Sequence, residues 1–129
     1  PFVYDRAWQI KEKLNILAME QAAKLLVGEH DFTNFRSTGS EEGSAVRTIY
    51  RADLTAKDMN LYLDIVSNGF LYHMVRNIES GLVQVGLGRH GLAEFQKALQ
   101  LQPNALEHSP APAQGLYLVE VGYNDYNFA

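Results

Sequence analysis

The hydrophobic positions in the first half of the chain predict a helix followed by a pair of strands. Across residues 6–27 apolar side chains recur at helical spacing, which predicts one long amphipathic helix, and Gly28 is placed to end it. Across residues 47–55 and 60–68 apolar and polar side chains alternate, and the short polar connection between them predicts a hairpin. The side chains expected to face inward are Ile49, Ala52, Leu54, Leu61, Leu63, Ile65 and Val66.

The second half of the pattern adds two helices and a last strand. Residues 69–85 and 91–101 show helical spacing, whereas residues 116–123 alternate as a strand does. Three prolines in residues 102–114 argue against regular structure there, and residues 37–44 are expected to form an exposed, glycine-containing loop. The order of elements predicts a single α+β domain over residues 1–129, with helices packed on one face of an antiparallel sheet.

Composition narrows the class of protein. Hydrophobic residues make up 47% of the chain, which excludes wholesale disorder, and no apolar run approaches the roughly 20 residues that span a bilayer. Cysteine is absent, so disulfides and thiolate metal sites are excluded. A chain without cysteine is compatible with the cytoplasm. The net charge of −4 argues against a free-standing nucleic-acid binder. A basic wall would still form if the fold gathered Arg36, Arg47, Arg51, Lys57, Arg76 and Arg89.

The helix predicted at residues 69–85 carries a polar stripe beside its apolar face. His73, Arg76, Asn77 and Ser80 follow the i, i+3, i+4 spacing, so a helix would present them together. An arginine on such a packed element is a fixed cation suited to an acidic or phosphate-bearing partner. The alternative is an arginine that only tethers a loop or a helix end, and the spacing alone favours that structural role.

Other candidate chemistry is weak. The four histidines are scattered without metal-ligand spacing, and neither a phosphate-binding loop nor a serine nucleophile elbow is present. Asp31 reads as a turn or N-cap residue, and Phe32 and Phe35 are expected to be buried, although one of them could stack on a base. Arg36 borders the glycine-containing loop, from which it could reach a phosphate.

Four segments in order resemble one family of enzymes. Residues 69–86 are similar to the phrase GFLYHMVRNIVG, and residues 28–37 are similar to GEHDFSAFR. Residues 46–49 match VRTI, and residues 111–119 are similar to APPQGLYL. Together they resemble the tRNA pseudouridine synthase A family from about Asp5 to Tyr123. The resemblance covers the carboxyl-terminal half of such an enzyme and nothing else.

The resemblance implies a function and half of an active site. The family's aspartate nucleophile lies in a GRTDAGVHA motif that this chain lacks, and its active-site tyrosine lies in the same missing amino-terminal half. Of the catalytic set only the arginine maps here, onto Arg76. The intact enzyme would be a cytoplasmic homodimer that converts uridine to pseudouridine in the tRNA anticodon stem-loop. It would need no metal or cofactor, and the chain alone would be inactive. The residues expected to bind RNA are Arg36, Arg47, His73 and Asn77.

Within this resemblance, Arg76 would keep the aspartate ionised and orient it through a bidentate pair. Glu79 departs from the family, whose members usually have an apolar residue after the Arg-Asn-Ile run. Glu79 could pair with Arg76 three residues before it, or could point to solvent or to a differently built interface. Two alternatives stay open: a non-catalytic RNA-binding module on the same scaffold, and a generic α+β interaction domain with structural arginines.

Overall fold

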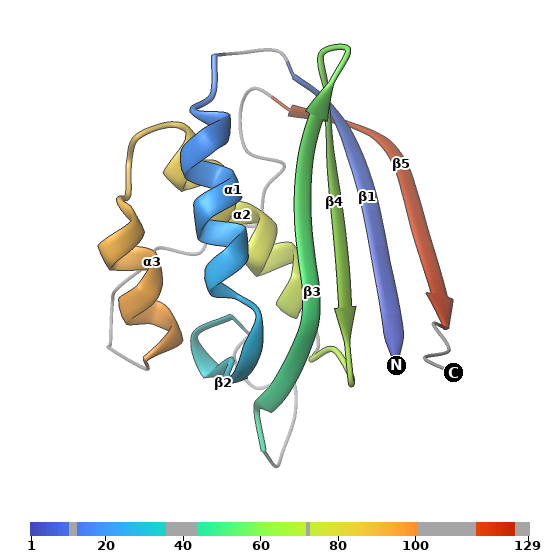
Figure 1. Cartoon of the computed structure of the whole chain (residues 1–129), viewed down its shortest axis with the longest axis vertical. Coiled ribbons are helices and arrows are strands. Elements are labelled where there is room, and N and C mark those ends of the chain that lie inside the picture. Colours follow the sequence, from blue (N-terminus) through green and yellow to red (C-terminus); the bar gives the residue numbers. More distant parts are fainter. Residues whose placement is uncertain (11–12, 36–43, 72, 101–115, 126–129) are drawn as a thin grey trace.

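A five-stranded antiparallel sheet with helices on one face forms the protein (Figure 1). The computed structural model describes residues 1–10, 13–35, 44–71, 73–100 and 116–125, with the last range described as backbone only. In space the strands follow the order β2-β3-β4-β1-β5. The α+β architecture expected from the sequence is therefore confirmed. The elements are β1 (Phe2–Ile10), α1 (Ile16–Leu25), β2 (Gly28–Asp31), the 3₁₀ helix η1 (Thr33–Phe35), β3 (Val46–Lys57), β4 (Asn60–Ser67), α2 (Met74–Gly86), α3 (Leu92–Leu99) and β5 (Leu116–Asp125).

The beginning of the chain corrects the first predicted helix, because residues 6–10 belong to a strand. β1 pairs with β4 on one side and with β5 on the other, so it lies inside the sheet. Tyr4 and Trp8 are buried on its helix-covered side, while Val3 and Ala7 are also buried, so alternation is weak. α1 begins only at Ile16, where the Asn15 side chain accepts a hydrogen bond from the amide of Ala18 at 3.1 Å.

The end of α1 also differs from the expectation. The helix ends at Leu25, with Leu26 as its C-cap, so Gly28 does not end it. Gly28 instead begins β2 with a φ of 113°, a backbone conformation that glycine adopts without strain. The short edge strand β2 was not predicted from the sequence, because four residues carry too little periodicity to separate a strand from a loop.

The central hairpin of β3 and β4 is confirmed. All seven side chains expected to face inward are buried. Asp58 and Met59 form the two-residue connection, both with left-handed φ angles of 53° and 65°. Such angles match the right-handed twist of the flanking strands. The last strand and α3 are confirmed as well, whereas the expectations for residues 37–43 and 101–114 lie outside the described residues.

The core lies between the sheet and the helices. Phe32, Phe35 and Phe95 are fully buried, with successive ring centroids 5.9 and 5.8 Å apart, and they join η1 to α3. The burial expected for Phe32 and Phe35 is thus confirmed, as is the turn role of Asp31, whose Oδ1 accepts the amide of Thr33 at 3.0 Å. These contacts fix η1 and α3 beside α2, the helix that carries the predicted site.

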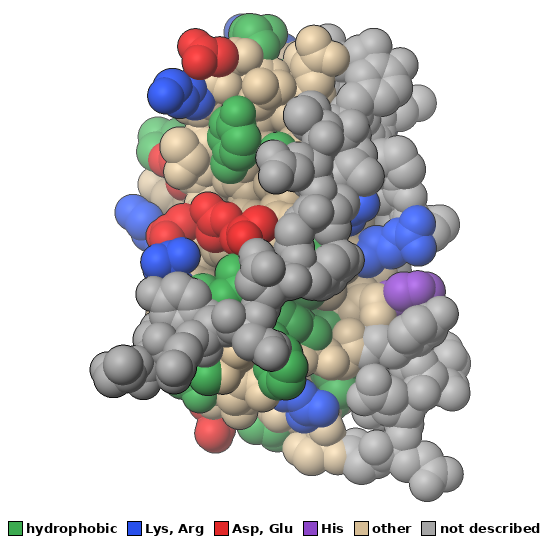
Figure 2. All heavy atoms as spheres, turned by 90° about the vertical axis from the view of Figure 1, so that its right-hand side faces the viewer, with side chains coloured by type: hydrophobic (Ala, Val, Ile, Leu, Met, Phe, Trp, Pro, Cys, Tyr) green, Lys and Arg blue, Asp and Glu red, His purple; other side chains and the backbone are tan. Residues whose placement is uncertain are grey.

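The opposite face of the sheet carries a row of three aspartates. Asp64 on β4 lies opposite Asp5 on β1 and opposite Asp53 on β3. Figure 2 shows acidic side chains gathered on this face beside basic ones. Burial, followed by the hydrogen bond and negative charge of Asp5, raises the pKa of Asp64 to about 6. Arg51 opposes this shift and pairs with Asp53, with Nε and Oδ2 3.1 Å apart.

No helix within the described part of the chain is both long and apolar enough to cross a membrane.

Candidate functional site: a basic pocket at the start of α2

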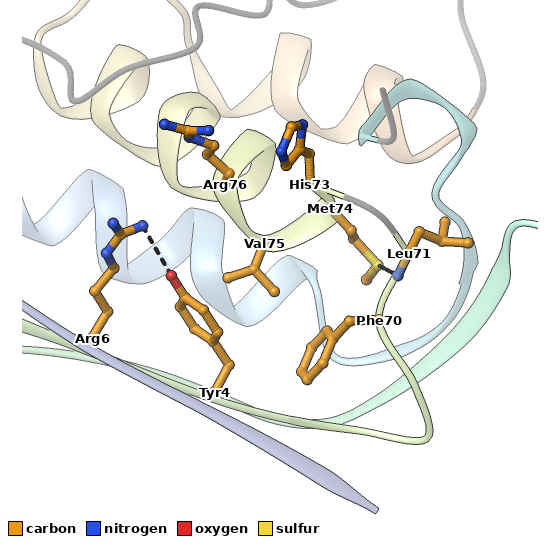
Figure 3. Close-up of a pocket in the computed structure, with 8 residues that line it drawn as sticks. All are labelled: Tyr4, Arg6, Phe70, Leu71, His73, Met74, Val75 and Arg76. Atoms are coloured by element: carbon orange, nitrogen blue, oxygen red, sulfur yellow. Dashed lines mark hydrogen bonds between the residues drawn. The ribbon is translucent and has the colours of Figure 1, made fainter. Parts of the chain in front are cut away.

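Two of the predicted site residues, His73 and Arg76, line a pocket between β1 and the first turn of α2. The pocket has a volume of about 290 Å³, and its rim and floor come from β1, from α2 and from the segment that joins β4 to α2. Figure 3 shows two guanidinium groups, from Arg6 and Arg76, on the same side of this space, with aromatic rings below them. The lining residues are Tyr4, Arg6, Phe70, Leu71, His73, Met74, Val75 and Arg76.

α2 begins later than the sequence predicted, which divides the expected polar stripe. Residues 69–71 precede the helix, and His73 occupies its N-cap position with a left-handed φ of 57°. His73 and Arg76 line the pocket, whereas Asn77 and Ser80 are buried. The four residues therefore do not form one exposed stripe. The spacing was correct for a helix that included His73, but the chain enters α2 one residue too late for that geometry.

Arg76 lies on the first turn of α2 with its side chain exposed and lining the pocket. Among the described residues it has neither a hydrogen-bond partner nor a carboxylate within 4.0 Å. The described structure therefore gives no support to the alternative in which Arg76 tethers a loop. A guanidinium presented in this way, on a packed helix, is available to an anionic group from outside the chain.

Asn77 has a contact inside the protein. It is 7% exposed, and its Nδ2 donates to the carbonyl of Phe35 at 2.9 Å. This bond joins α2 to the end of η1, immediately before Arg36 in the sequence. Arg36 itself lies outside the described residues. The expected contacts of both residues with RNA stay predictions, and the geometry gives Asn77 a way to act by holding the segment that leads to Arg36.

Arg47 lines a second, neighbouring pocket of about 510 Å³ that shares Phe70 with the first. Its Nη1 donates to the carbonyls of Ser44 and Val46, at 3.0 and 2.8 Å, which holds the side chain at the start of β3. Not all of the basic residues gather here, however, because Arg51 pairs with Asp53 on the opposite face of the sheet. The basic wall considered from the sequence is therefore only partly formed.

The position of Glu79 differs most clearly from the sequence expectation. Its side chain neither points to solvent nor pairs with Arg76. It is 6% exposed; its Oε1 accepts from the Tyr4 hydroxyl at 2.6 Å, and its Oε2 pairs with Nη1 of Arg6. The same Nη1 donates to the Tyr4 hydroxyl oxygen at 2.9 Å. Burial raises the pKa of Glu79, while Tyr4, Arg6 and the charge of Arg76 act against that rise.

The cluster of Tyr4, Arg6 and Glu79 was missed because the sequence placed residue 6 in a helix rather than beside α2. One signal was present: a carboxylate on a helix that packs against a core must find a partner if it is buried. That rule predicts a partner without naming it. Only the position of β1 across from α2 identifies the partners as Tyr4 and Arg6.

The pocket can bind and orient an anion. It presents two guanidiniums and one imidazole, and one of the guanidiniums, that of Arg6, pairs with the buried carboxylate of Glu79. Among the residues that the structure describes, no group of three histidine, aspartate or glutamate side chains could hold a metal ion. The described pocket also has no carboxylate exposed to act as a nucleophile, so a bond-making group would have to come from elsewhere.

Comparison with known proteins finds similarity to one family of enzymes. A sequence model of the family described as "tRNA pseudouridine synthase" matches residues 22–124. The chain is 44% identical over 123 residues to the tRNA pseudouridine synthase A of Neisseria meningitidis serogroup B, covering 95% of this chain and 46% of that protein. It is 40% identical over 121 residues to the protein of the same name from Blochmanniella floridana, covering 94% and 48%. The corresponding match in Bartonella quintana is 38% over 118 residues, covering 92% and 48%. The chain thus spans about half the length of the curated relatives it matches.

Proposed function

The chain belongs to the tRNA pseudouridine synthase family, and from this premise we propose that it forms the carboxyl-terminal half of an enzyme that converts uridine to pseudouridine in tRNA. The substrate we propose is the anticodon stem-loop, bound by a cytoplasmic homodimer. The pocket at the start of α2 would be this half's share of the active site. Because the described pocket has no exposed carboxylate, the aspartate nucleophile would come from the amino-terminal half.

The proposed reaction exchanges one bond of the ribose for another. The bond between C1′ and N1 of uracil breaks, the base rotates, and C1′ bonds to C5. C5 then loses its proton and N1 gains one. The overall change is an isomerisation and needs neither an oxidant nor a cofactor. The target nucleotide must leave its stack to reach the nucleophile, which costs a few kcal/mol and needs compensating contacts.

In this reaction Arg76 would hold the aspartate of the other half ionised and in position. A carboxylate that enters a partly dry pocket has its pKa raised by desolvation, and a guanidinium close by opposes that shift. The planar fork of arginine can bind both carboxylate oxygens, which fixes their direction as well as their charge. What supports this assignment is the exposed Arg76 guanidinium, which has no partner among the described residues and lines the pocket.

The RNA-binding surface would extend from this pocket toward Arg47. His73 lines the first pocket and Arg47 the second, and Phe70 belongs to both, so RNA crossing the two would pass over an aromatic ring. Asn77 would contribute by holding the end of η1, next to Arg36 in the sequence. This division of roles is part of the proposal.

The experiment combines this chain with a separately prepared amino-terminal half and measures tritium release from tRNA labelled at C5 of uridine. Release that requires both halves, and that falls at least about a hundredfold with Arg76→Lys, would support the proposal, because lysine keeps the charge and loses the fork. Arg51→Lys is the matched control, since Arg51 lies on the opposite face of the sheet and should retain normal release. Absence of release from a folded complex that still binds tRNA would point instead to a non-catalytic RNA-binding module. Normal release by Arg76→Lys would refute the role given to Arg76.

A further inference from the structure

A second guanidinium shares the pocket with Arg76, and it comes from a different element. Arg6 lies on β1, and its side chain is 21% exposed where it meets the pocket. Figure 3 shows the Arg6 and Arg76 side chains reaching toward the same space from β1 and α2. Two arginines that converge from separate elements make a stronger anion site than either alone, because their fields add in the space between them.

Arg6 is held on several sides. Its Nη1 pairs with Glu79 and donates to the Tyr4 hydroxyl, and its guanidinium carbon lies 5.3 Å from the centre of the Trp8 ring. Glu79 is itself fixed on α2, in the middle of buried residues. Arginine is a flexible side chain whose freedom must be lost when it binds a ligand, so contacts that fix it in advance favour binding.

The bonds that hold Arg6 leave part of its guanidinium available. Among the described residues, Nη1 alone of its three nitrogens has hydrogen-bond partners, and Nε is buried without one. The donors of Nη2 therefore remain for a ligand. The negative charge of Glu79, buried next to Arg6, repels an anion that enters the pocket. Glu79 can therefore favour anion binding only by holding the Arg6 guanidinium in position.

We propose that Arg6 binds a backbone phosphate of the RNA at this pocket, and that Glu79 is the positioning residue that fixes Arg6 for this contact. The inference rests on the proposed function, which supplies RNA as the ligand and gives Arg76 to the nucleophile. A nucleotide that leaves its stack brings its own phosphate to the rim of the pocket, and a fixed guanidinium matches the geometry of a phosphate. Arg6 and Arg76 then serve two different anions.

The direction in which Glu79→Gln changes the affinity for tRNA tests whether Glu79 positions Arg6. Glu79→Gln removes a negative charge next to RNA, so plain electrostatics predicts tighter tRNA binding. If Glu79 positions Arg6, the same substitution should weaken tRNA binding, by about threefold to tenfold, because the pairing with Nη1 becomes a weaker neutral bond. The measurement is the Kd for tRNA of the two-part enzyme as a function of salt. Glu29→Gln, on the exposed part of β2, is the matched control and should leave the Kd unchanged or slightly lower.

Arg6→Gln should raise the Kd about tenfold and reduce the slope of log K against log salt by about 0.7–0.9, the loss of one phosphate contact. Combining Arg6→Gln with Glu79→Gln should add little, because both act through the same contact. Tyr4→Phe removes a hydroxyl that bonds both partners and should weaken binding in the same direction. If Glu79→Gln fails to fold, Tyr4→Phe replaces it in the binding experiment. Thermal unfolding of each variant will show whether it folds.

Three results would overturn the inference. Tighter or unchanged tRNA binding by a folded Glu79→Gln enzyme would show that Glu79 does not position Arg6. An unchanged salt slope in Arg6→Gln would remove the phosphate contact. A fall in kcat at saturating tRNA, with normal Kd, would place Arg6 on the nucleophile instead. Tritium release by the unmodified enzyme tests the proposed function separately, so failure of one is distinguishable from failure of the other.

Discussion

The row of aspartates on the open face of the sheet should limit the stability of the protein above neutral pH. Asp64 occupies the middle of this row, with Asp5 and Asp53 directly across from it on the two neighbouring strands. Like charges at directly opposed positions of a sheet destabilise it. Replacing Asp64 with asparagine removes the central charge, keeps the shape of the side chain and leaves an amide that can donate to Asp5.

The magnitude follows from the pKa of Asp64, which burial and then Asp5 raise from 3.8 to about 6. A raised pKa means that the folded chain prefers the protonated carboxyl. The resulting stabilisation is fully present below pH 3.8 and is lost as the pH rises through about 6. At about 1.36 kcal/mol per unit the full shift would be worth about 3 kcal/mol. Because Asp64 is only half-buried, screening by solvent reduces this to about 1 kcal/mol.

The assay is urea unfolding of the purified chain at pH 4, 6 and 8, followed by the fluorescence of Trp8, its single tryptophan. Asp64→Asn should raise the free energy of unfolding by about 1 kcal/mol at pH 8 and change it little at pH 4. Asp58→Asn is the matched control, since it removes the same charge at the exposed hairpin turn and tolerates the left-handed backbone there. A pH-independent effect of Asp64→Asn, or a loss of stability at pH 8, would refute the reasoning.

Three further substitutions test the packing around the site, each by chemical unfolding. Gly86→Ala should cost about 1–3 kcal/mol, because a Cβ at this position would overlap the sulfur of Met19; an unchanged midpoint would contradict that close packing. Met59→Gly should raise stability by about 0.5–1 kcal/mol by relieving a left-handed φ of 65°, and a loss would mean that the exposed Met59 side chain contributes more than the strain. Asn77→Ala should cost about 1–3 kcal/mol because the Phe35 carbonyl loses its donor, and Asn77→Asp, which cannot donate when ionised, should behave alike; full stability in both would remove the structural role.

The elements that the sequence predicted correctly are those with a strong local pattern. The hairpin of β3 and β4 alternates around its turn, and α3 has a clear apolar face, so each local pattern agreed with its place in the fold. The sequence prediction failed for β1 because a strand inside a sheet can be apolar on both faces. The apolar residues of such a strand fit a helical period as well as an alternating one. β2 was not predicted because four residues are too few to show a hydrophobic periodicity.

For the site, the sequence supplied the identity of Arg76 and its place on a packed helix. It could not supply Arg6 or the partners of Glu79, because these residues are about 73 positions apart in the chain and no local pattern links them. It also placed Asn77 with the exposed residues, although the structure buries Asn77 against the end of η1. Which face of a helix is covered depends on the elements packed against it.

The sequence by itself therefore determined the class of fold, the family and two residues of the candidate site, His73 and Arg76. It could do so because periodicity and motifs are properties of neighbouring residues. The tertiary structure alone decided where β1 runs, which residues hold the buried carboxylate of Glu79, and that two guanidiniums share one pocket. The physical reason is that burial and charge pairing depend on distances in space between segments far apart in the chain. Those distances exist only once the sheet has formed and α2 has packed across it.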